Sequence, residues 1–203
     1  MRKASSDIAI QTAAAATISG HLFRASLIAK HLALAAKNSR AMVLRAGEKA
    51  VGLKVISDYF DDLAGKTINL STSINKRAIS ISRTSVRQWR TQTFLDRMDK
   101  SQSRLAGRKA SQLTPSIDER QHYLSSLIGT LQTELKSLQE QLADINQYMQ
   151  SSSVVAVTFK LEATQTGEFQ PLLEDMAKTI NGHSNDIKYH ITNSQKQLSQ
   201  FHV

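Results

Sequence analysis

Cysteine is absent from this chain of 203 residues, and proline occurs only twice and glycine eight times. The lack of cysteine excludes disulfides, thiolate nucleophiles, iron–sulfur clusters and cysteine-based zinc sites. With so few helix breakers, long stretches can stay helical, which argues against an all-β fold. Aromatic residues make up 5% and hydrophobic residues 40%. This is enough apolar material for an interface between helices, but little for the large hydrophobic core of a compact globular domain. The composition therefore predicts an elongated, all-α protein.

Long hydrophobic runs are missing as well. No segment approaches the roughly 18 to 20 apolar residues that a membrane-spanning helix needs. The N-terminal segment, which otherwise imitates a secretory signal, is interrupted by Asp7 and Gln11. We therefore expect a soluble, cytoplasmic protein without a transmembrane segment.

Three breaks divide the chain into four predicted helical arms. The central break lies at residues 113–116, where Pro115 ends one helix and Ser116 can cap the next. The other two breaks are marked by Gly47 with Gly52 and by Gly167 with Pro171. The arms span roughly residues 6–46, 53–113, 117–165 and 172–201.

Apolar residues recur every three or four positions along the third arm, which is typical of a coiled-coil seam. They are Leu124, Leu127, Ile128, Leu131, Leu135, Leu138, Leu142 and Ile145. The run from Val154 to Phe159 is rich in β-branched residues, but we expect it to be helical, because an isolated strand would leave its backbone groups unpaired. The predicted fold is a long antiparallel four-helix bundle or coiled coil made from two tandem helical hairpins.

Residues 28–64 carry a recognisable pattern around the sequence Arg-Ala-Gly-Glu. The residues that match it in register are Asn38, Arg45, Ala46, Gly47, Glu48, Gly52, Val55, Leu63 and Ala64. This ungapped segment resembles the cytoplasmic hairpin tip of methyl-accepting chemotaxis proteins. The resemblance implies an antiparallel hairpin that turns near Gly47 to Gly52. It further implies that two such hairpins form a four-helix bundle whose tip binds a histidine kinase and a coupling protein.

The second half of the chain looks like a divergent copy of the first. Residues 162–168 lie 120 positions beyond residues 42–48 and repeat the Gly-Glu pair at Gly167 and Glu168. We therefore predict one hairpin over residues 1–114, with its tip near 47–52, and a shorter one over 115–203, with its tip near 166–171. Together they form one continuous bundle, so that the protein is a monomer resembling a dimer. The predicted partner-binding tip residues are Asn38, Arg45, Glu48, Glu162 and Glu168, and the predicted turn glycines are Gly47, Gly52 and Gly167.

An alternative interpretation treats the chain as a structural or adaptor rod without kinase control. The glutamate that precedes the motif in the family is Met42 here, and the upstream glutamine and asparagine are His31 and Ala33. Such a rod binds an anionic surface or partner through a basic ridge, whose cations recur at heptad spacing or one turn away. The basic ridge comprises Lys76, Arg83, Arg87, Arg90, Arg97, Arg104 and Arg108.

Charge is distributed unevenly, which offers an internal explanation for the ridge. Residues 1–115 hold 20 cationic and 7 acidic side chains, an excess of 13 positive charges, whereas residues 116–203 hold 6 and 10, an excess of 4 negative charges. Complementary halves attract each other. A chain that folds back near residue 114 pairs Glu140 with Arg87 and Arg90, and Asp118 or Glu119 with Arg108.

No constellation for catalysis or metal binding emerges from the sequence. His183 and His190 are one heptad apart, but no third ligand completes a metal site, and we interpret them as ordinary boundary residues. Gln139-Glu140 is the nearest approach to a receptor methylation site, and we expect it to stay unmethylated. We predict a protein that is not an enzyme, uses no cofactor or metal, and acts through protein partners. A nucleic-acid partner is disfavoured because no reading motif is present, while peripheral contact with an anionic membrane stays open.

Overall fold

The computed structural model describes residues 2–104 and 113–201, and these residues form helices, 3-10 turns and short connections without a strand. The elements are α1 (Arg2–Ala46), η1 (Gly47–Ala50), α2 (Val51–Gln102), α4 (Thr114–Ala163), η2 (Gly167–Phe169) and α5 (Gln170–Leu198). The predicted all-α fold is confirmed, and the β-branched run from Val154 to Phe159 is helical, within α4.

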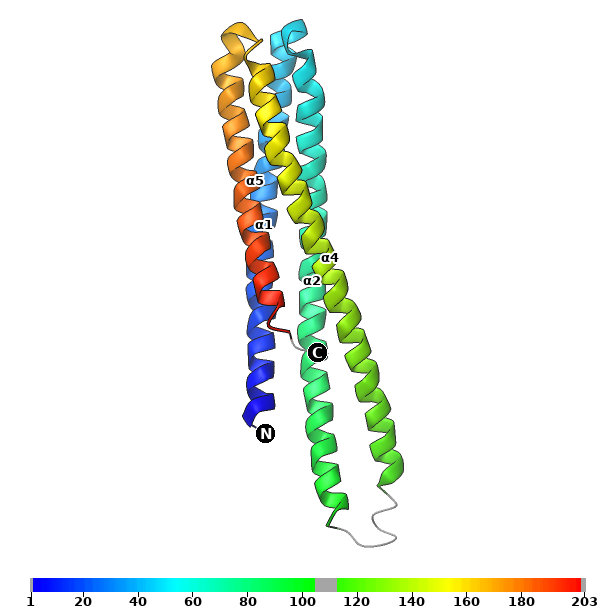
Figure 1. Ribbon diagram of the computed structural model, residues 1–203. Coiled ribbons are helices and arrows are strands. Elements are labelled where there is room, and N and C mark those ends of the chain that lie inside the picture. Colours follow the sequence, from blue (N-terminus) through cyan, green and yellow to red (C-terminus); the bar gives the residue numbers. More distant parts are fainter. Residues whose placement is uncertain (1, 105–112, 202–203) are drawn as a thin grey trace.

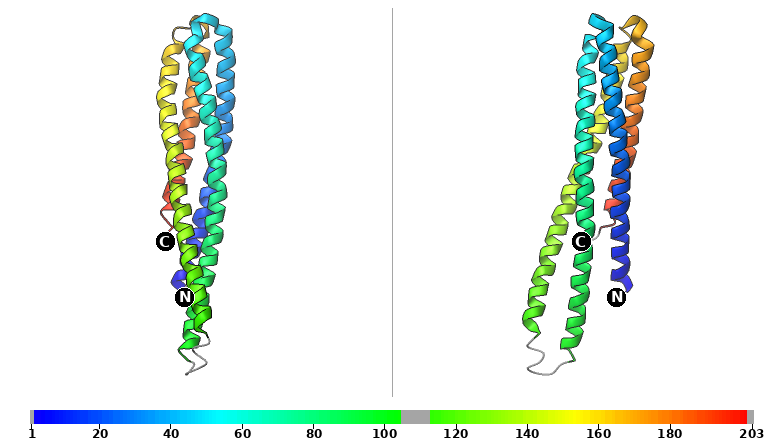
Figure 2. Two further views of the ribbon diagram at one scale, coloured as in Figure 1. Left: turned by 90° about the vertical axis from the view of Figure 1, so that its right-hand side faces the viewer. Right: turned by 180° about the vertical axis from the view of Figure 1, so that it is seen from behind.

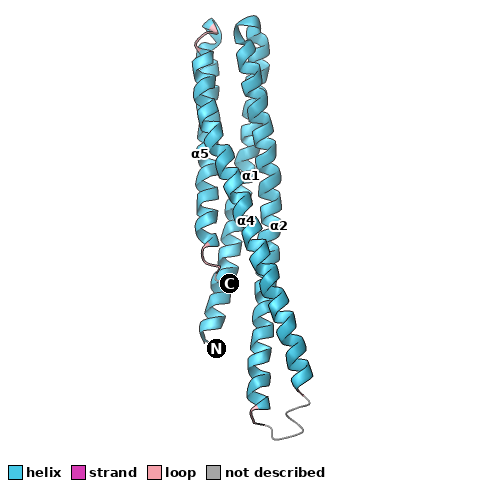
Figure 3. Cartoon of the chain, turned by 45° about the vertical axis from the view of Figure 1, so that its right-hand side comes forward, coloured by secondary structure: helices cyan, strands magenta, loops and turns pink. Residues whose placement is uncertain are grey.

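Consecutive helices run in opposite directions and pack side by side as a rod (Figure 1). Contacts join α1 to α2, α2 to α4, α4 to α5 and α5 back to α1, so that the helices close into a ring of four. The turn between α1 and α2 and the turn between α4 and α5 therefore lie at the same end of the rod (Figure 3). This is the antiparallel bundle of two tandem hairpins that the sequence predicts.

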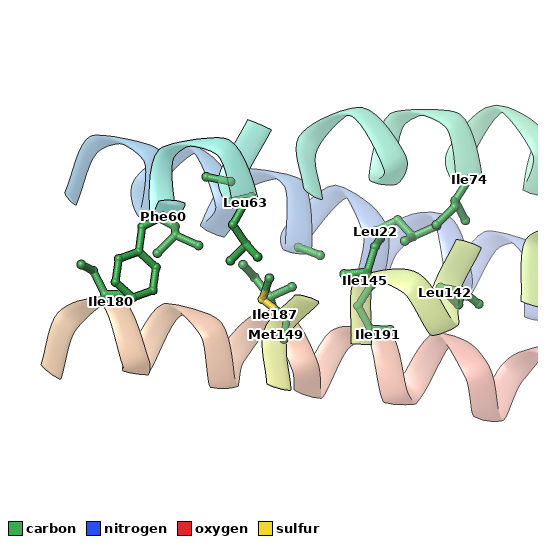
Figure 4. Packing of buried hydrophobic residues seen from close by; sticks show 14 of the residues in the cluster. Leu22, Phe60, Leu63, Ile74, Leu142, Ile145, Met149, Ile180, Ile187 and Ile191 are labelled. Atoms are coloured by element: carbon green, nitrogen blue, oxygen red, sulfur yellow. The ribbon is translucent and has the colours of Figure 1, made fainter. Parts of the chain in front are cut away.

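Along each helix, inward-facing residues are separated alternately by three and by four sequence positions, which is the periodicity of knobs-into-holes packing. In α1 the buried residues include Ile18, Leu22, Ala25, Ala29, Leu32, Ala36, Ser39 and Val43. In α5 they include Leu173, Ala177, Ile180, Ser184, Ile187 and Ile191. Their side chains converge with those of α2 and α4 on the axis of the bundle (Figure 4).

Two serine pairs interrupt the apolar seam, one in each hairpin. Ser39 of α1 shares a buried hydrogen bond with Ser57 of α2, with 3.0 Å between the hydroxyl oxygens. Ser152 of α4 and Ser184 of α5 do the same at 2.6 Å. Because buried hydroxyl groups need partners, each pair favours one register of its hairpin.

The helices differ in length, and this shapes the two ends of the rod. The α4 helix has 50 residues and α5 has 29. The α2 and α4 helices therefore continue past the ends of α1 and α5, away from the hairpin tips (Figure 2).

The predicted cap of the third arm is wrong. The α4 helix begins at Thr114, so that Ser116 lies inside it, and the N-cap residue Leu113 makes no side-chain cap hydrogen bond. Pro115 occupies the first turn, where its fixed φ suits a helix and its missing N–H leaves no hydrogen bond unmade. Proline thus starts this helix without a side-chain cap.

A search of the described residues for membrane spans finds no helix with the length and apolarity that crossing a bilayer requires.

Replacing the turn glycine of the second hairpin should destabilise the protein. Gly167 has a φ of 63°, in the left-handed region, which costs a residue with a Cβ on the order of 1 kcal/mol. We expect Gly167→Ala to lower the free energy of unfolding in urea by about that amount. The matched control is Gly129→Ala, because Gly129 lies within α4 with open space around its Cα. Alanine there should raise stability by up to about 1 kcal/mol. Equal effects of the two substitutions would contradict the assigned turn.

The closed ring of four helices predicts a monomer in solution. Size-exclusion chromatography with light scattering at micromolar concentration should give a mass near 22.5 kDa. A stable species of twice that mass would indicate instead that hairpins are exchanged between two chains.

Candidate functional site

The first hairpin tip is built around Gly47. This residue has a φ of 64°, a conformation that ends α1 and that L side chains rarely adopt. The 3-10 turn Gly47–Ala50 reverses the chain, and α2 starts at Val51. Gly52, predicted as part of the turn, therefore lies in the first turn of α2 instead.

The second tip repeats this design 120 residues later. Gly167 has a φ of 63°, nearly the value at Gly47. Before it, the buried Thr166 hydroxyl donates a hydrogen bond to the Ala163 carbonyl oxygen at 2.6 Å, and the Thr166 backbone N–H donates to the same oxygen at 3.1 Å. These bonds satisfy a carbonyl group that the end of α4 leaves without a helical partner.

The two tips touch through Gly52 and Glu162. A Cβ atom added to Gly52 would lie 3.3 Å from Oε2 of Glu162, near the end of α4. The absence of a side chain at Gly52 thus lets a carboxylate of the second hairpin approach the backbone of the first. Two residues that the sequence predicts for the tips separately become neighbours in the structure.

The other predicted tip residues are spread along the end of the rod. Arg45 is exposed at the end of α1 and donates a weak hydrogen bond from Nη1 to the sulfur of Met42 at 3.9 Å. Glu168 is exposed in η2. Asn38 is exposed nine residues before Gly47, about 13 Å along the helix, so it flanks the tip. The side chain of Glu48 lies outside the part of the chain that the structure describes.

Below the first tip, an ion pair links α1 and α2. Arg40 Nη1 lies 3.1 Å from Asp58 Oδ1, beside the buried Ser39–Ser57 pair. Both side chains are about half exposed, so the ion pair contributes at most about 1 kcal/mol. Its position follows from folding the chain back at the first tip, because residue numbers 40 and 58 average 49, which lies in the turn.

Large apolar side chains are exposed around both tips, and sequence reasoning missed them. We call Leu44, Val55, Leu161 and Leu172 the apolar tip residues. Leu161 is 66% and Val55 is 73% exposed. Val154 and Val157, also exposed, extend the row from Leu161 along one face of α4. The signal was present, because these residues fall outside the three-four seam, and exposed apolar patches mark interaction surfaces.

The basic ridge is exposed along α2 and, at Arg104, just past the end of that helix. Lys76, Arg83, Arg87, Arg90, Arg97 and Arg104 are all exposed, and no ion pair in the described part of the chain involves any of them. Arg108 lies outside the described residues, and so does its predicted pairing with Asp118 or Glu119.

The predicted pairing of Glu140 with Arg87 and Arg90 does not occur, because α2 and α4 meet in another register. In two antiparallel helices, residues that face each other have numbers with a constant average. The contacts Ser73–Gln141 and Phe94–Arg120 both give an average of 107. Reflection about 107, rather than about 114, places Glu140 across from position 74, more than three helical turns from Arg87 and Arg90. The ion pair between these helices is instead Arg77–Glu134, at 3.1 Å.

Four histidines meet in pairs between α1 and α5. His21 and His190 place their Nδ1 atoms 2.9 Å apart, so that one nitrogen donates and the other accepts a hydrogen bond. The ring centroids of His31 and His183 are 6.1 Å apart. His183 and His190 thus face α1, which their heptad spacing alone did not reveal. Among the described residues, no group of three or more potential ligands is placed to hold a metal ion.

Burial and neighbouring charge disfavour protonation of His21, His183 and His190. Desolvation lowers the pKa of His21, and the Arg24 guanidinium lowers it further. Desolvation, His21 and Arg24 lower the pKa of His190, against a smaller opposing effect of Asp186. The pKa of His183 is lowered by desolvation and by His31, again opposed by Asp186.

No protein-family model, curated protein or solved structure matches the chain in the comparisons.

The lowered histidine pKa values predict that acid weakens the fold. An unfolded histidine titrates near 6.5, so below that pH the unfolded chain binds more protons than the folded one. Stability should be level above about pH 7.5 and fall as the pH drops toward about 5.5. Urea unfolding at several pH values measures this slope.

Replacing the two α5 histidines, His183 and His190, should flatten that pH dependence. We expect the double variant His183→Leu, His190→Leu to lose most of the slope between about pH 7.5 and 5.5. The control is His122→Gln, because His122 is exposed on α4 and bonds only locally to the Asp118 carbonyl. An unchanged slope in the double variant would assign the acid sensitivity to other groups.

Proposed function

We propose that this chain is a receptor-like signalling or interaction protein that acts through its paired hairpin tips. Its partners are a chemosensory histidine kinase, a coupling protein or an array of receptors. The observation that carries the proposal is the joining of two tips at one end of the rod, with Glu162 lying over Gly52. One chain thereby presents the double tip that the resembled family builds from two hairpins.

The surface of the tips suits a protein partner. The tip region carries apolar side chains such as Val55 and Leu161 and charged ones such as Arg45 and Glu168, all of them exposed. Interfaces commonly combine a few apolar anchors with a polar rim. The proposed contact requires no catalytic group, cofactor or metal, and under this proposal the protein works in the cytoplasm with its partners.

The rigidity of the rod supports the same function. The seam continues from the tips down all four helices, so the tip geometry is set by packing rather than by a free loop. A pre-organised surface loses little conformational entropy when it binds. The tips are therefore presented in one arrangement.

Substitutions at the tips should weaken partner binding without affecting the fold. We expect Val55→Ser with Leu161→Ser, and separately Arg45→Ala with Glu168→Ala, to lower co-sedimentation with assembled kinase and coupling protein. The loss should be about tenfold, the usual effect of removing an interface anchor. Circular dichroism should show unchanged helix content.

The matched control is Phe23→Ser, because Phe23 is 71% exposed on α1, far along the helix from Gly47. It should bind as the unaltered protein does. If the unaltered chain fails to co-sediment, or if the control loses as much binding as the tip variants, the tip function is refuted.

A second candidate function is favoured by the exposed basic ridge. The chain then serves as an adaptor rod without kinase control, and its cations rather than its tips make the decisive contact. The absence of an ion pair to any of the ridge residues from 76 to 104 is the observation behind this alternative.

A further inference from the structure

The basic ridge forms a row along the outer face of α2, with Arg104 just past the end of the helix. From Lys76 to Arg97 the row extends over about 32 Å of helix. Steps of seven residues return to nearly the same face, and Arg87 lies one turn from both Arg83 and Arg90. The row therefore matches a flat or extended anionic partner rather than a small ligand.

Acidic side chains are kept off this face. Asp96 and Asp99 are the only acidic residues of the chain between positions 76 and 104. At about 100° per residue they lie about 120° and 180° around the helix from Arg90. The inward cation Arg77 is paired with Glu134, whereas the ridge is left unneutralised.

Exposed apolar residues stand within the row of cations. Ile79 is 43% and Phe94 is 41% exposed, and both lie within about 40° of Arg90 around the helix. The guanidinium group of Arg120, from α4, lies 5.7 Å from the centre of the Phe94 ring. The face thus combines positive charge with apolar groups, and α4 adds a cation to it.

A shallow apolar groove borders the ridge between α1 and α2. It encloses about 310 Å³ and is lined by Ala15, Ala16, Ser19 and Ile79, with Arg83 at its side. Small residues on α1 leave this space open. An apolar group can enter it while the guanidinium group of Arg83 holds a nearby anion.

We propose that the basic ridge is a docking surface for an anionic lipid bilayer, on which the rod lies lengthwise. The cations bind headgroup phosphates and carboxylates, and Ile79 and Phe94 enter the boundary between headgroups and acyl chains. A bilayer presents anionic headgroups across a flat surface, with apolar acyl chains directly beneath them. The phosphates of a nucleic-acid duplex instead follow a helical path that diverges from the basic ridge. A duplex also has no exposed apolar group to fill the groove between α1 and α2. This inference does not depend on the function of the tips.

Vesicle co-sedimentation of the full chain tests the proposal. The unaltered protein should bind phosphatidylcholine vesicles that contain about 30% phosphatidylserine, and hardly bind vesicles of phosphatidylcholine alone. The partition coefficient should fall steeply as salt rises from about 0.05 M to about 0.3 M. The triple variant Arg83→Gln, Arg90→Gln, Arg97→Gln should bind about a hundredfold more weakly, because each cation near the surface contributes roughly a fivefold factor.

The control variant removes the same number of charges from elsewhere. Lys30, Lys136 and Lys188 are exposed on α1, α4 and α5, and their replacement by glutamine should lower binding less than about threefold, because few of them reach the same surface at once. Circular dichroism and urea unfolding verify that both triple variants are folded.

Three results would overturn the proposal. One is equal loss of binding in the ridge and control variants, because net charge alone would then explain it. Another is equal binding to neutral and anionic vesicles. The third is a ridge variant that keeps its affinity for vesicles but loses affinity for a DNA duplex, since the ridge would then serve nucleic acid. None of these results bears on whether the tips bind a kinase.

Discussion

The bundle depends on one constraint, the three-four alternation of inward-facing side chains over the length where all four helices pack together. Many of these side chains are small, such as Ala25, Ala29 and Ala36 in α1, and each layer buries little apolar area. Stability therefore accumulates with length, which is why the helices are long and the protein is a rod. Small side chains also let the helices approach closely, so that serine hydroxyls of neighbouring helices, such as Ser152 and Ser184, reach hydrogen-bonding distance.

The seam also determines which charged and apolar side chains are exposed on the surface of the rod. Inward positions are taken by apolar and small residues, so charged groups project outward unless a neighbouring helix meets them, as α4 meets Arg77 through Glu134. The basic ridge and the apolar tip residues are both consequences of this geometry, because they occupy positions that the seam does not use. The candidate tip and the ridge thus lie on different parts of one scaffold and can act independently.

Polar groups within the seam adjust the fold rather than create it. The His21–His190 contact is partly buried, enough to favour neutral imidazoles, and the neighbouring residues Leu22 and Ile191 are fully buried. A neutral donor and acceptor are satisfied there, whereas two protonated rings would repel each other. The packing of α5 on α1 is accordingly the part of the bundle most directly coupled to proton concentration.

The sequence alone determined the helical class, the number of arms and two turn glycines, Gly47 and Gly167, because periodicity and backbone preference are local properties. It also identified the residues of the ridge, but it assigned Gly52 to the turn, whereas Gly52 lies in α2. Only the tertiary structure decided that Glu162 meets Gly52, that four histidines form two pairs, and that Glu134 rather than Glu140 meets an arginine of α2. Such contacts depend on the register between helices, and a heptad pattern allows several registers. The packing of the whole seam selects one of these registers. As a result, paired residues of α2 and α4 have numbers that average about 107, whereas a chain folding back beside Pro115 predicts an average near 114.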